Sequence, residues 1–374
     1  MIWLFWSSAA FLLYTLLLYP LLVWVIARVR NRAHVRQTIQ PFVSLIVAVH
    51  NEERQIAGKI QNCLSLTYPK DKLEIIVVCD GCSDATPVIV RGFAGQGVRL
   101  IEVPERRGKH NGQAVARDAA KGDVLLFTDA GVSLPADAVQ KIVANFGDLT
   151  VGCVSSEDRV GNPEKAEASY ISLEMMLRRL ESRMGSLVGV SGSFFAARRS
   201  VCYPWDPELS SDFFVPLHAN AHGLRAVVDP ESIGYYGVVS KDSAEFGRKV
   251  RTIVHGLDVF FTHLYMLDPF RYGLFAWQLV SHKLFRWLLP FGAASLLASN
   301  ALLWDRGWFY QGGLIAQVAA YAAGTLAWAV PPMSRLKPMR LASFFVLGNA
   351  ATLAAWWRYI SGERFVTWEP SRRG

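Results

Sequence analysis

Three acidic residues stand where apolar runs of the sequence end. Glu52, Asp80 and Asp129 each lie at or just past the last residue of a run that is long enough for one buried strand. In a parallel sheet such positions share one edge, and ligands bind beyond the carboxyl ends of the strands. The pattern therefore predicts a ligand site in which these three carboxylates take part.

A different chemistry is suggested by Cys79 and Cys82, which have the spacing of a redox dithiol. A thioredoxin-like dithiol opens a helix, whereas residues 81–83 are typical of a loop and the next helix is expected near Thr86. The chain has five cysteines and no second close pair, so neither a disulfide framework nor a four-cysteine zinc site is indicated. We interpret both cysteines as small buried residues in a protein of a reducing compartment.

The elements that hold these residues alternate between buried apolar runs and amphipathic segments. This alternation predicts an α/β domain with right-handed crossovers and a mostly parallel sheet that helices cover on both faces. The expected strands cover residues 42–50, 72–80, 98–105 and 123–130, and the expected helices cover residues 51–66, 85–95 and 108–122.

The N-terminal segment predicts a membrane anchor. Residues 2–27 carry no charge and are nearly all apolar, which is long enough to span a bilayer with some tilt. The positive-inside rule places the basic residues that follow in the cytoplasm and Met1 outside. A cleaved signal peptide fits poorly, because the basic cluster follows the apolar run instead of preceding it. The cluster consists of Arg28, Arg30, Arg32 and Arg36.

The C-terminal part of the chain becomes apolar again. Residues 268–287 mix aromatic and basic side chains, which is typical of an amphipathic helix at a membrane surface. Residues 288–304 and 308–330 are predicted to span the bilayer, and residues 341–357 are near the lower length limit of a span. If the last segment crosses, the basic tail lies outside, and if it is interfacial, the tail stays inside. The flanking basic residues are Arg335, Lys337 and Arg340 in the loop and Arg364, Arg372 and Arg373 in the tail.

The overall composition agrees with a membrane protein. The 374-residue chain is 52% hydrophobic and has a formal net charge of +8. A basic balance favours nucleic acid, anionic lipid or a phosphorylated substrate as partner, and the apolar excess favours the membrane over nucleic acid.

Five segments, taken in order, resemble the membrane-bound family 2 glycosyltransferases, the group that contains cellulose, chitin and hyaluronan synthases. The resemblance covers nearly the whole chain. It implies an N-terminal anchor, a cytoplasmic GT-A-type catalytic domain for nucleotide-diphosphate sugars, and C-terminal membrane helices. The segments are VSLIVAVHNEE, LEIIVVCDGCSDAT, RRGKHNGQAVA, LLFTDAGVSLP and YISLEMMLRRLESRMGSLVGVSGSFFAARR.

The resemblance implies roles on the donor side. Glu52 and Asp80 would accept hydrogen bonds from the base and ribose of a nucleotide-diphosphate-sugar donor. Asp129 would bind Mg²⁺ or Mn²⁺ or the ribose, and Lys109 would be a cationic partner of the diphosphate, with two neighbouring arginines as alternatives. Gly131 stands where the family carries a second carboxylate. The ion would therefore rely on Asp129, donor phosphates and water, or on another residue.

The resemblance also implies an acceptor side. Ser191 and Gly192 would border the acceptor, and Asp212 would be the general base that removes a proton from the acceptor hydroxyl. A serine precedes Asp212 where the family has an acidic residue, and Asp206 and Glu208 are nearby alternatives. The same serine and aspartate run would also cap a helix well.

The family's processive members carry a Gln-x-x-Arg-Trp motif, which this chain matches only in part. Arg251 occupies the arginine position, where it would contact the diphosphate, but Arg248 replaces glutamine and Thr252 replaces the stacking tryptophan. We therefore expect addition of one or a few sugars. A basic helix face against anionic lipid is the alternative.

Two histidines with the spacing of a metal pair on a helix complete the candidate residues. His218 and His222 are four residues apart, but no glutamate-bearing motif accompanies them. We interpret them as part of a surface helix face.

These observations predict an inverting glycosyltransferase of the inner membrane with a cytoplasmic catalytic domain. It would move a sugar to a membrane-associated glycan or lipid acceptor, contact membrane lipids and bind no nucleic acid. The alternative is a degenerate, non-catalytic membrane protein that binds sugar nucleotides or glycans. The expected divisions are an anchor at 1–36, a catalytic domain at 37–265, an interfacial helix at 266–287 and membrane helices at 288–374.

The predicted orientation can be tested in intact cells. An engineered cysteine at Asp148 should be protected from a membrane-impermeant thiol reagent, because the basic cluster after residue 27 holds the catalytic domain in the cytoplasm. The same cysteine should react after the cells are permeabilised. Ready labelling without permeabilisation would contradict the orientation.

Overall fold

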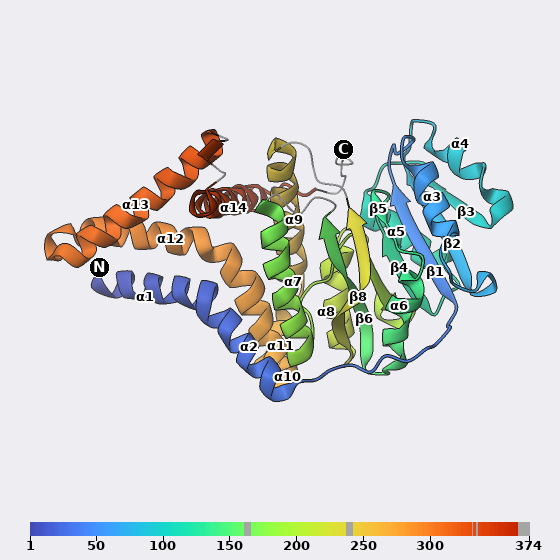
Figure 1. Ribbon diagram of the computed structural model, residues 1–374, viewed down its shortest axis with the longest axis horizontal. Coiled ribbons are helices and arrows are strands. Elements are labelled where there is room, and N and C mark those ends of the chain that lie inside the picture. The colour runs from blue at the N-terminus through green and yellow to red at the C-terminus, as the bar shows by residue number, and fades with distance from the viewer. Residues whose placement is uncertain (161–165, 237–241, 331, 334–335, 366–374) are drawn as a thin grey trace.

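The computed structural model describes residues 1–160, 166–236, 242–330, 332–333 and 336–365. Arg335 of the expected loop and Arg372 and Arg373 of the expected tail lie outside this part of the chain. Figure 1 shows two halves side by side. One half carries the sheet, and the other consists of long helices from both the N-terminal and the C-terminal part of the sequence.

Within the described residues, one eight-stranded sheet of order β3-β2-β1-β4-β7-β6-β8-β5 forms the centre of the first half. The four expected strands are β1 to β4, and they pair in parallel as predicted. β7 runs antiparallel to its neighbours β4 and β6, while β6 and β8 pair in parallel. The bounds are β1 (Val43–Val49), β2 (Leu73–Asp80), β3 (Val98–Val103), β4 (Val124–Thr128), β5 (Val132–Ser133), β6 (Val151–Val160), β7 (Phe194–Arg198) and β8 (Arg225–Tyr236).

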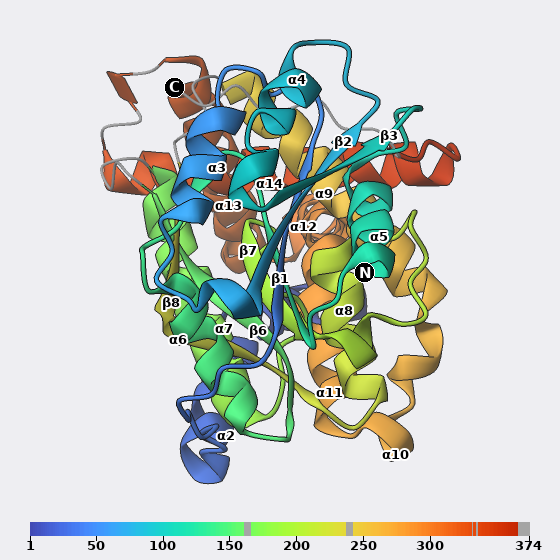
Figure 2. The same ribbon diagram turned by 90° about the vertical axis from the view of Figure 1, so that its right-hand side faces the viewer.

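Helices cover both faces of the sheet, and this is why β1 and β4 are apolar at nearly every position and fully buried. Figure 2 shows α3 and α6 on one side of the strands and α5 and α8 on the other. Each side has its own hydrophobic core. The helices of this half are α3 (Ile56–Leu64), α4 (Thr86–Arg91), α5 (Lys109–Ala119), α6 (Ala138–Ala144), α7 (Ala166–Met184), α8 (Ser211–Ala221) and α9 (Asp242–Thr262).

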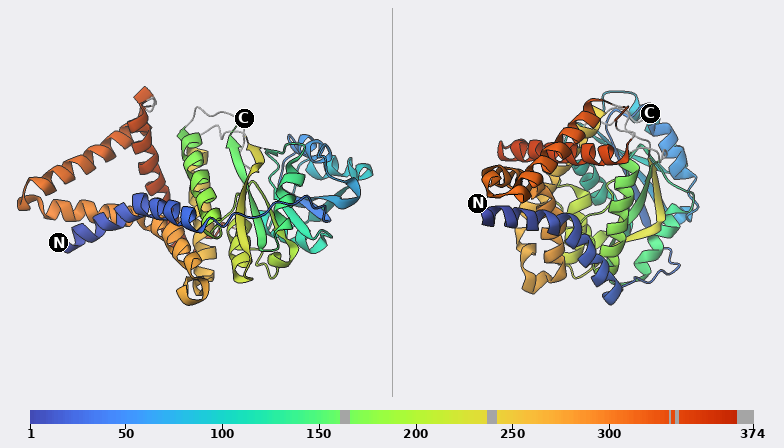
Figure 3. Two further views of the ribbon diagram at one scale, coloured as in Figure 1. Left: turned by 60° about the horizontal axis from the view of Figure 1, so that its bottom comes forward. Right: turned by 60° about the vertical axis from the view of Figure 1, so that its left-hand side comes forward.

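The N-terminal segment is one continuous helical run. It consists of α1 (Ile2–Leu13), the π-helical turn η1 (Tyr14–Leu18) and α2 (Tyr19–Arg30). In the described part of the chain, only this run is long and apolar enough to cross a membrane by length and composition. Figure 3 shows it beside α12 and directed away from the sheet. This agrees with an N-terminal anchor, whereas the C-terminal spans stay predictions.

The segment expected as one amphipathic surface helix is broken into pieces. It forms α10 (Pro269–Tyr272), α11 (Leu274–Gln278) and the π-helical turn η7 (Leu279–Leu284), and it breaks at Gly273, whose φ is +55°. The polar side chains of Gln278 and His282 are buried. They hydrogen-bond Ser186 and Glu181 at the end of α7, so this segment packs on the catalytic half instead of presenting a polar face to solvent.

Three helices follow and form the far end of the molecule. They are α12 (Phe285–Leu302), α13 (Trp308–Ala329) and α14 (Lys337–Ile360). The last of them returns to the catalytic half, where Ala351 and Ala355 pack against Val250 and Val254 of α9. Residues 341–357, for which the sequence left a membrane crossing open, therefore belong to a helix that packs against α9.

Arg225 joins two separate pieces of backbone where the two halves meet. Its guanidinium donates to the carbonyl oxygens of Ser182, Gly185 and Arg32, at 2.8, 2.7 and 2.6 Å. The residue is 8% exposed. This single side chain at the start of β8 fastens the end of α7 to the linker that follows α2.

Replacing this side chain tests the junction. Arg225→Met should lower the free energy of unfolding by about 2–4 kcal/mol, because three buried carbonyls lose a charged donor. Thermal unfolding of the purified full-length protein gives the measurement. Arg183→Met is the matched control, since Arg183 lies on the same helix end and is exposed. Equal melting temperatures for the two variants would refute this role.

Candidate active site

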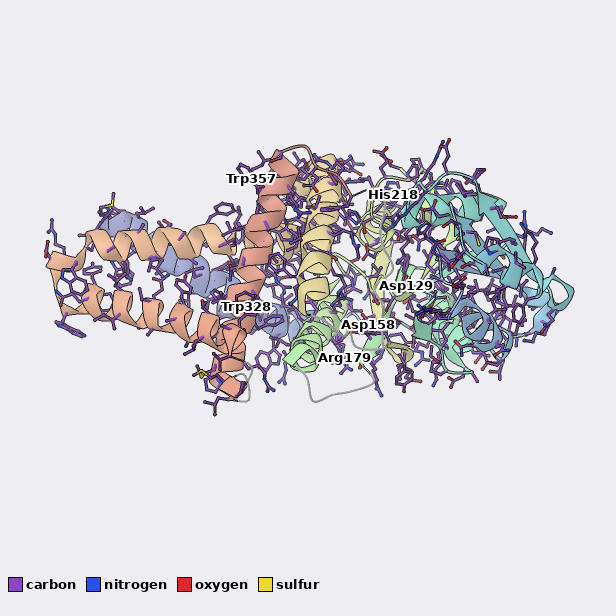
Figure 4. All side chains as sticks on the ribbon, turned by 90° about the horizontal axis from the view of Figure 1, so that it is seen from above. Asp129, Asp158, Arg179, His218, Trp328 and Trp357 are labelled. Carbon is purple, nitrogen blue, oxygen red and sulfur yellow. The ribbon has the colours of Figure 1, made fainter. Side chains whose placement is uncertain are left out.

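A cavity of about 370 Å³ opens at the carboxyl ends of β1 and β4, where the sequence predicted a ligand site. Its walls also include the start of α5, the loop before β7, the start of α8 and one face of α9. Figure 4 shows Asp129 and Asp158 between the long helices and the end of the molecule that carries the first strands of the sheet. Seven of the eight predicted site residues line it, namely Glu52, Lys109, Asp129, Ser191, Gly192, Asp212 and Arg251.

Asp80 is the predicted residue that does not line the cavity. Its side chain is fully buried, and its two carboxylate oxygens accept hydrogen bonds from the backbone N–H groups of Arg107 and Gly108, at 2.8 and 2.6 Å. Gly81 follows with φ +59°, and a Cβ there would meet the Arg106 backbone at 2.6 Å. The Asp-Gly pair therefore holds the loop that begins α5, and a contact of Asp80 with a ligand stays a prediction.

Lys109 connects the end of β4 with the loop before β7 across the cavity. Its Nζ lies 2.5 Å from Oδ1 of Asp129 and donates to the carbonyl oxygen of Gly192 at 3.0 Å. It is the first residue of α5, directly after Gly108, whose φ of +94° turns the chain into the helix. The ammonium group is thus fixed against the strand end and the loop before β7.

Asp129 is the carboxylate that the sequence offered for a metal ion. Within the described residues no three His, Cys, Asp or Glu side chains gather closely enough to hold an ion by themselves. Asp129 nevertheless faces the cavity, beside Gly131, which has no side-chain ligand. The protein thus supplies one carboxylate, which fits an oxygen-preferring ion that takes its remaining ligands from a bound phosphate and water.

Asp212 is the second residue of α8, and its side chain is half-buried in the cavity wall. Oδ1 accepts a hydrogen bond from the hydroxyl of Ser210, and no side chain caps this helix end. Burial raises the pKa of Asp212, but nearby His110, the Ser210 hydrogen bond and the ammonium groups of Lys109 and Lys283 outweigh it. The pKa lies below its ordinary value, so the carboxylate is ionised at neutral pH.

Gly192 permits the close approach of this carboxylate to the loop before β7. A Cβ at that position would lie 2.8 Å from Oδ2 of Asp212. The backbone N–H of Val190 also donates to the carbonyl oxygen of Asp212, at 2.8 Å. The loop and the start of α8 therefore form one unit around the carboxylate.

Asp158 is a cavity residue that sequence reasoning missed. It lies near the end of β6, and its Oδ1 accepts hydrogen bonds from the hydroxyl groups of Ser191 and Ser193, both at 2.6 Å. Burial raises its pKa above the ordinary value, more than the nearby Arg178 and the two hydroxyls lower it. No motif marked this residue, because β6 enters the site only through its pairing with β7 and β8.

A pair of histidines was also missed. The rings of His110 and His255 are 5.6 Å apart at the cavity wall, and the backbone N–H of Ser211 lies 3.2 Å from Nδ1 of His110. Burial, followed by the charge of His255 and Lys109, lowers the pKa of His110 to about 3. Burial likewise lowers the pKa of His255, so both imidazoles are neutral at physiological pH. The two residues are 145 positions apart, so only the packing of α5 against α9 brings them together.

The α9 face that reaches the cavity carries Arg248, Arg251, Thr252 and His255. Burial and the neighbouring Arg248 lower the pKa of Arg251. Because α14 covers another face of α9, these cations face the cavity, which agrees with the predicted contact of Arg251 with an anionic ligand.

The other candidate chemistries do not meet in this cavity. Cys79 is 2% exposed, and its hydrogen bond with Cys82, followed by burial, raises its pKa, which makes a reactive thiolate unfavourable. His218 packs on Phe214 with ring centroids 4.1 Å apart, and burial is the main cause that lowers its pKa to about 4. Neither pair lines the cavity.

A mostly parallel sheet with helices on both faces and a charged cavity at its carboxyl edge is the arrangement of a GT-A-type domain, and comparison with known proteins supports this fold class. A mannosyltransferase from Pyrobaculum calidifontis, solved with GDP-Man and Mn²⁺, superimposes with a TM-score of 0.76 at 24% identity. The match covers 96% of this chain and 99% of that one. This likeness confirms the predicted fold class.

Residues 44–204 match the family model Glycosyl transferase family 2. The beta-monoglucosyldiacylglycerol synthase of Trichormus variabilis is 27% identical over 200 residues, which are 50% of this chain and 43% of that protein. The poly-beta-1,6-N-acetyl-D-glucosamine synthase of Staphylococcus aureus is 26% identical over 199 residues, 50% of this chain and 48% of that protein. The chain thus spans less than half the length of these curated relatives.

Residues 44–204 therefore form a family 2 glycosyltransferase domain, as the resemblance of the five segments predicted. The matched residues contain Glu52, Lys109 and Asp129 but end before Asp212 and Arg251. The roles of the last two residues therefore rest on the geometry of the cavity.

The contact between Gly192 and Asp212 gives a sharp test of the site. Gly192→Ala should reduce transferase turnover about tenfold or more, because the new methyl group displaces the carboxylate from its position. Donor affinity and melting temperature should change little. Gly185→Ala is the control, since a Cβ there meets nothing closer than 4.0 Å. Normal turnover of Gly192→Ala would contradict the importance of this contact.

Proposed function

We propose that this protein is an inverting glycosyltransferase that moves a sugar from a nucleotide-diphosphate-sugar donor to an acceptor held at the membrane. One observation carries the proposal. An ionised carboxylate, Asp212, and a cationic group bound to a strand-end carboxylate, Lys109 with Asp129, line the same cavity. An acceptor hydroxyl needs the first group, and a leaving diphosphate needs the second.

The donor would bind with its diphosphate between Lys109 and Arg251. These two side chains approach the cavity from α5 and α9 and would bind the negative charge that grows as the glycosidic bond breaks. A divalent ion on Asp129 would stabilise the same charge. The Pyrobaculum enzyme's GDP-Man and Mn²⁺ support a donor and ion of this kind. Glu52, at the end of β1, is proposed to bind the nucleoside part.

Asp212 is proposed as the general base. The lowered pKa keeps its carboxylate ionised, and its approach to Gly192 directs it toward the loop where the acceptor would lie. It removes the proton from the acceptor hydroxyl, whose oxygen then attacks the anomeric carbon from the side opposite the diphosphate. Ser191 and Gly192 border that acceptor.

The acceptor is proposed to be membrane-bound, with the catalytic domain on the cytoplasmic side of the inner membrane. The apolar run from Ile2 to Arg30 supports a membrane location. The named products of the two relatives, a glycolipid and a polysaccharide, are consistent with it. Because Thr252 occupies the cavity wall where a stacking tryptophan would hold a growing chain, we propose that one or a few sugars are added.

A donor screen tests the function. Membranes that contain the protein are incubated with a panel of nucleotide sugars and divalent ions, and release of nucleoside diphosphate is followed together with the length of the labelled product. Release with one donor and a short product on an endogenous acceptor supports the proposal. No release with any donor would favour a degenerate binding protein, and a long polymer would contradict non-processive transfer.

The base can be tested separately. Asp212→Asn keeps the shape of the side chain but cannot accept the proton, so turnover should fall by about 10²–10⁴-fold while donor binding stays unchanged. Asp206→Asn is the control, because Asp206 was the sequence alternative and does not line the cavity. If both variants turn over normally, the catalytic base is another residue.

A further inference from the structure

Two cationic side chains beside the loop before β7, Arg178 and Lys283, have N–H groups without a hydrogen-bond acceptor within the described residues. Nη1 of Arg178 is buried without a partner, although Nε of the same side chain lies 3.5 Å from Glu174. Lys283 is half-buried, and its Nζ lies over the ring of Phe213, 4.8 Å from the centroid. Buried donors without acceptors are rare in proteins, and each calls for an explanation such as a bound water, ion or ligand.

Both groups border the same loop. A Cβ at Gly189 would lie 3.0 Å from Nζ of Lys283, so the ammonium rests directly against this backbone. Arg178 lines the cavity together with Val190 and Ser191, the next residues of the loop. The positive charge of Arg178 also lowers the pKa of Lys283. Two like charges therefore face each other across the loop that borders the acceptor.

The carboxylates near the two cations each have another partner. The charge of Arg178 acts on Asp158, which accepts hydrogen bonds from the hydroxyls of Ser191 and Ser193. Asp212 acts on the charge of Lys283 and accepts a hydrogen bond from the hydroxyl of Ser210. Glu174 is 2.9 Å from Arg286 and 3.4 Å from His282, in addition to its long contact with Arg178. Glu181 accepts from the hydroxyl of Tyr19 and lies 2.6 Å from His282. One carboxylate, Glu174, thus serves two guanidinium groups, and an added anion would relieve the repulsion between Arg178 and Lys283.

We propose that Arg178 and Lys283 form an anion site that binds the phosphate group of a lipid-linked acceptor. The inference rests on the proposed function and names the chemical class of its acceptor. Arginine and lysine are the side chains that bind phosphate oxygens best. In the proposed function the donor diphosphate binds Lys109 of α5 and Arg251 of α9, which both line the cavity. Arg178 and Lys283 belong to other elements, so we assign their site to the acceptor.

The elements that carry the two cations also hold the apolar N-terminal helix. Tyr19 of α2 bonds Glu181 of α7, and the hydroxyl of Tyr14 lies 2.8 Å from that of Ser281 in η7. Arg178 belongs to α7 and Lys283 to η7. A lipid that lies along the N-terminal helix would therefore bring its headgroup to this site, and this favours a lipid phosphate over a free one.

The test uses the full-length protein in nanodiscs of neutral phosphatidylcholine. Binding of a C55 polyprenyl phosphate is compared with that of the matching C55 polyprenol and with inorganic phosphate. We expect the lipid phosphate to bind at least tenfold more tightly than either one. Equal binding of the alcohol would overturn the anion site, and equal binding of inorganic phosphate would overturn the lipid source.

Variants identify the residues. Lys283→Gln and Arg178→Gln should each weaken binding of the polyprenyl phosphate about tenfold or more, and Lys283→Arg should restore most of it. Arg271→Gln is the matched control, because Arg271 is an exposed cation of the same segment. Unchanged affinity in both glutamine variants would overturn the proposal. Binding of the nucleoside diphosphate is measured in parallel and should not change, so failure of this site is distinguishable from failure of the donor site.

A pH series adds a second readout. Burial lowers the pKa of Lys283 to about 8, with opposing effects from Glu174 and Asp212 and a further lowering by Arg178 and Arg286. The lysine loses its charge above that pH, so the affinity of the wild type should fall between pH 7 and 9. Lys283→Arg keeps its charge and should show a smaller decrease. Identical pH profiles would contradict the role of the ammonium group.

Discussion

The ammonium group of Lys109 is the interaction on which the site depends. It binds a carboxylate at the end of β4 and a backbone carbonyl in the loop before β7, and it is fixed by the first turn of α5. An isolated lysine on a protein surface would lose considerable side-chain entropy in such a position. Here the Asp80 carboxylate binds the backbone N–H groups of the two residues before Lys109. The first turn of α5 is therefore held in position independently of the lysine side chain.

The acceptor side is organised by backbone contacts around a second carboxylate. Val190 and Gly192 allow the loop to lie against Asp212, and Ser191 and Ser193 turn their hydroxyl groups to Asp158. The two carboxylates differ in environment. Cations and a hydroxyl keep the pKa of Asp212 low, whereas burial raises that of Asp158. One cavity thereby contains an ionised carboxylate and a second carboxyl group that binds the hydroxyls of its own loop.

The helical half is connected to the cavity by polar contacts. Glu174 and Glu181 of α7 connect Tyr19 of the N-terminal helix with His282 and Arg286 of the C-terminal segment. The same helix α7 carries Arg178 into the cavity wall. The packing of the apolar helix and the shape of the acceptor side are therefore parts of one polar network, and a change in one is expected to be felt in the other.

The sequence by itself determined the first half of the fold and most of the residues at the carboxyl ends of β1 and β4 that line the cavity. Alternating apolar runs predicted β1 to β4, and because parallel strands end at one edge, Glu52 and Asp129 could be placed near each other. The order of five motifs identified the family, and the apolar run at the N-terminus predicted its helix. These features are local, or follow from strand direction alone.

Tertiary structure decided the rest, because the other contacts join residues that no pattern connects. Asp158 enters the cavity through strand pairing, and His255 enters it through the position of α9. Lys283 lies against Gly189 in a segment that was expected to be one surface helix but breaks at Gly273. Asp80 is the opposite case. The sequence predicted that this strand-end carboxylate contacts a ligand, but in the structure it accepts hydrogen bonds from two backbone N–H groups. Side-chain direction and burial depend on the whole chain, and neither is encoded in the spacing of one segment.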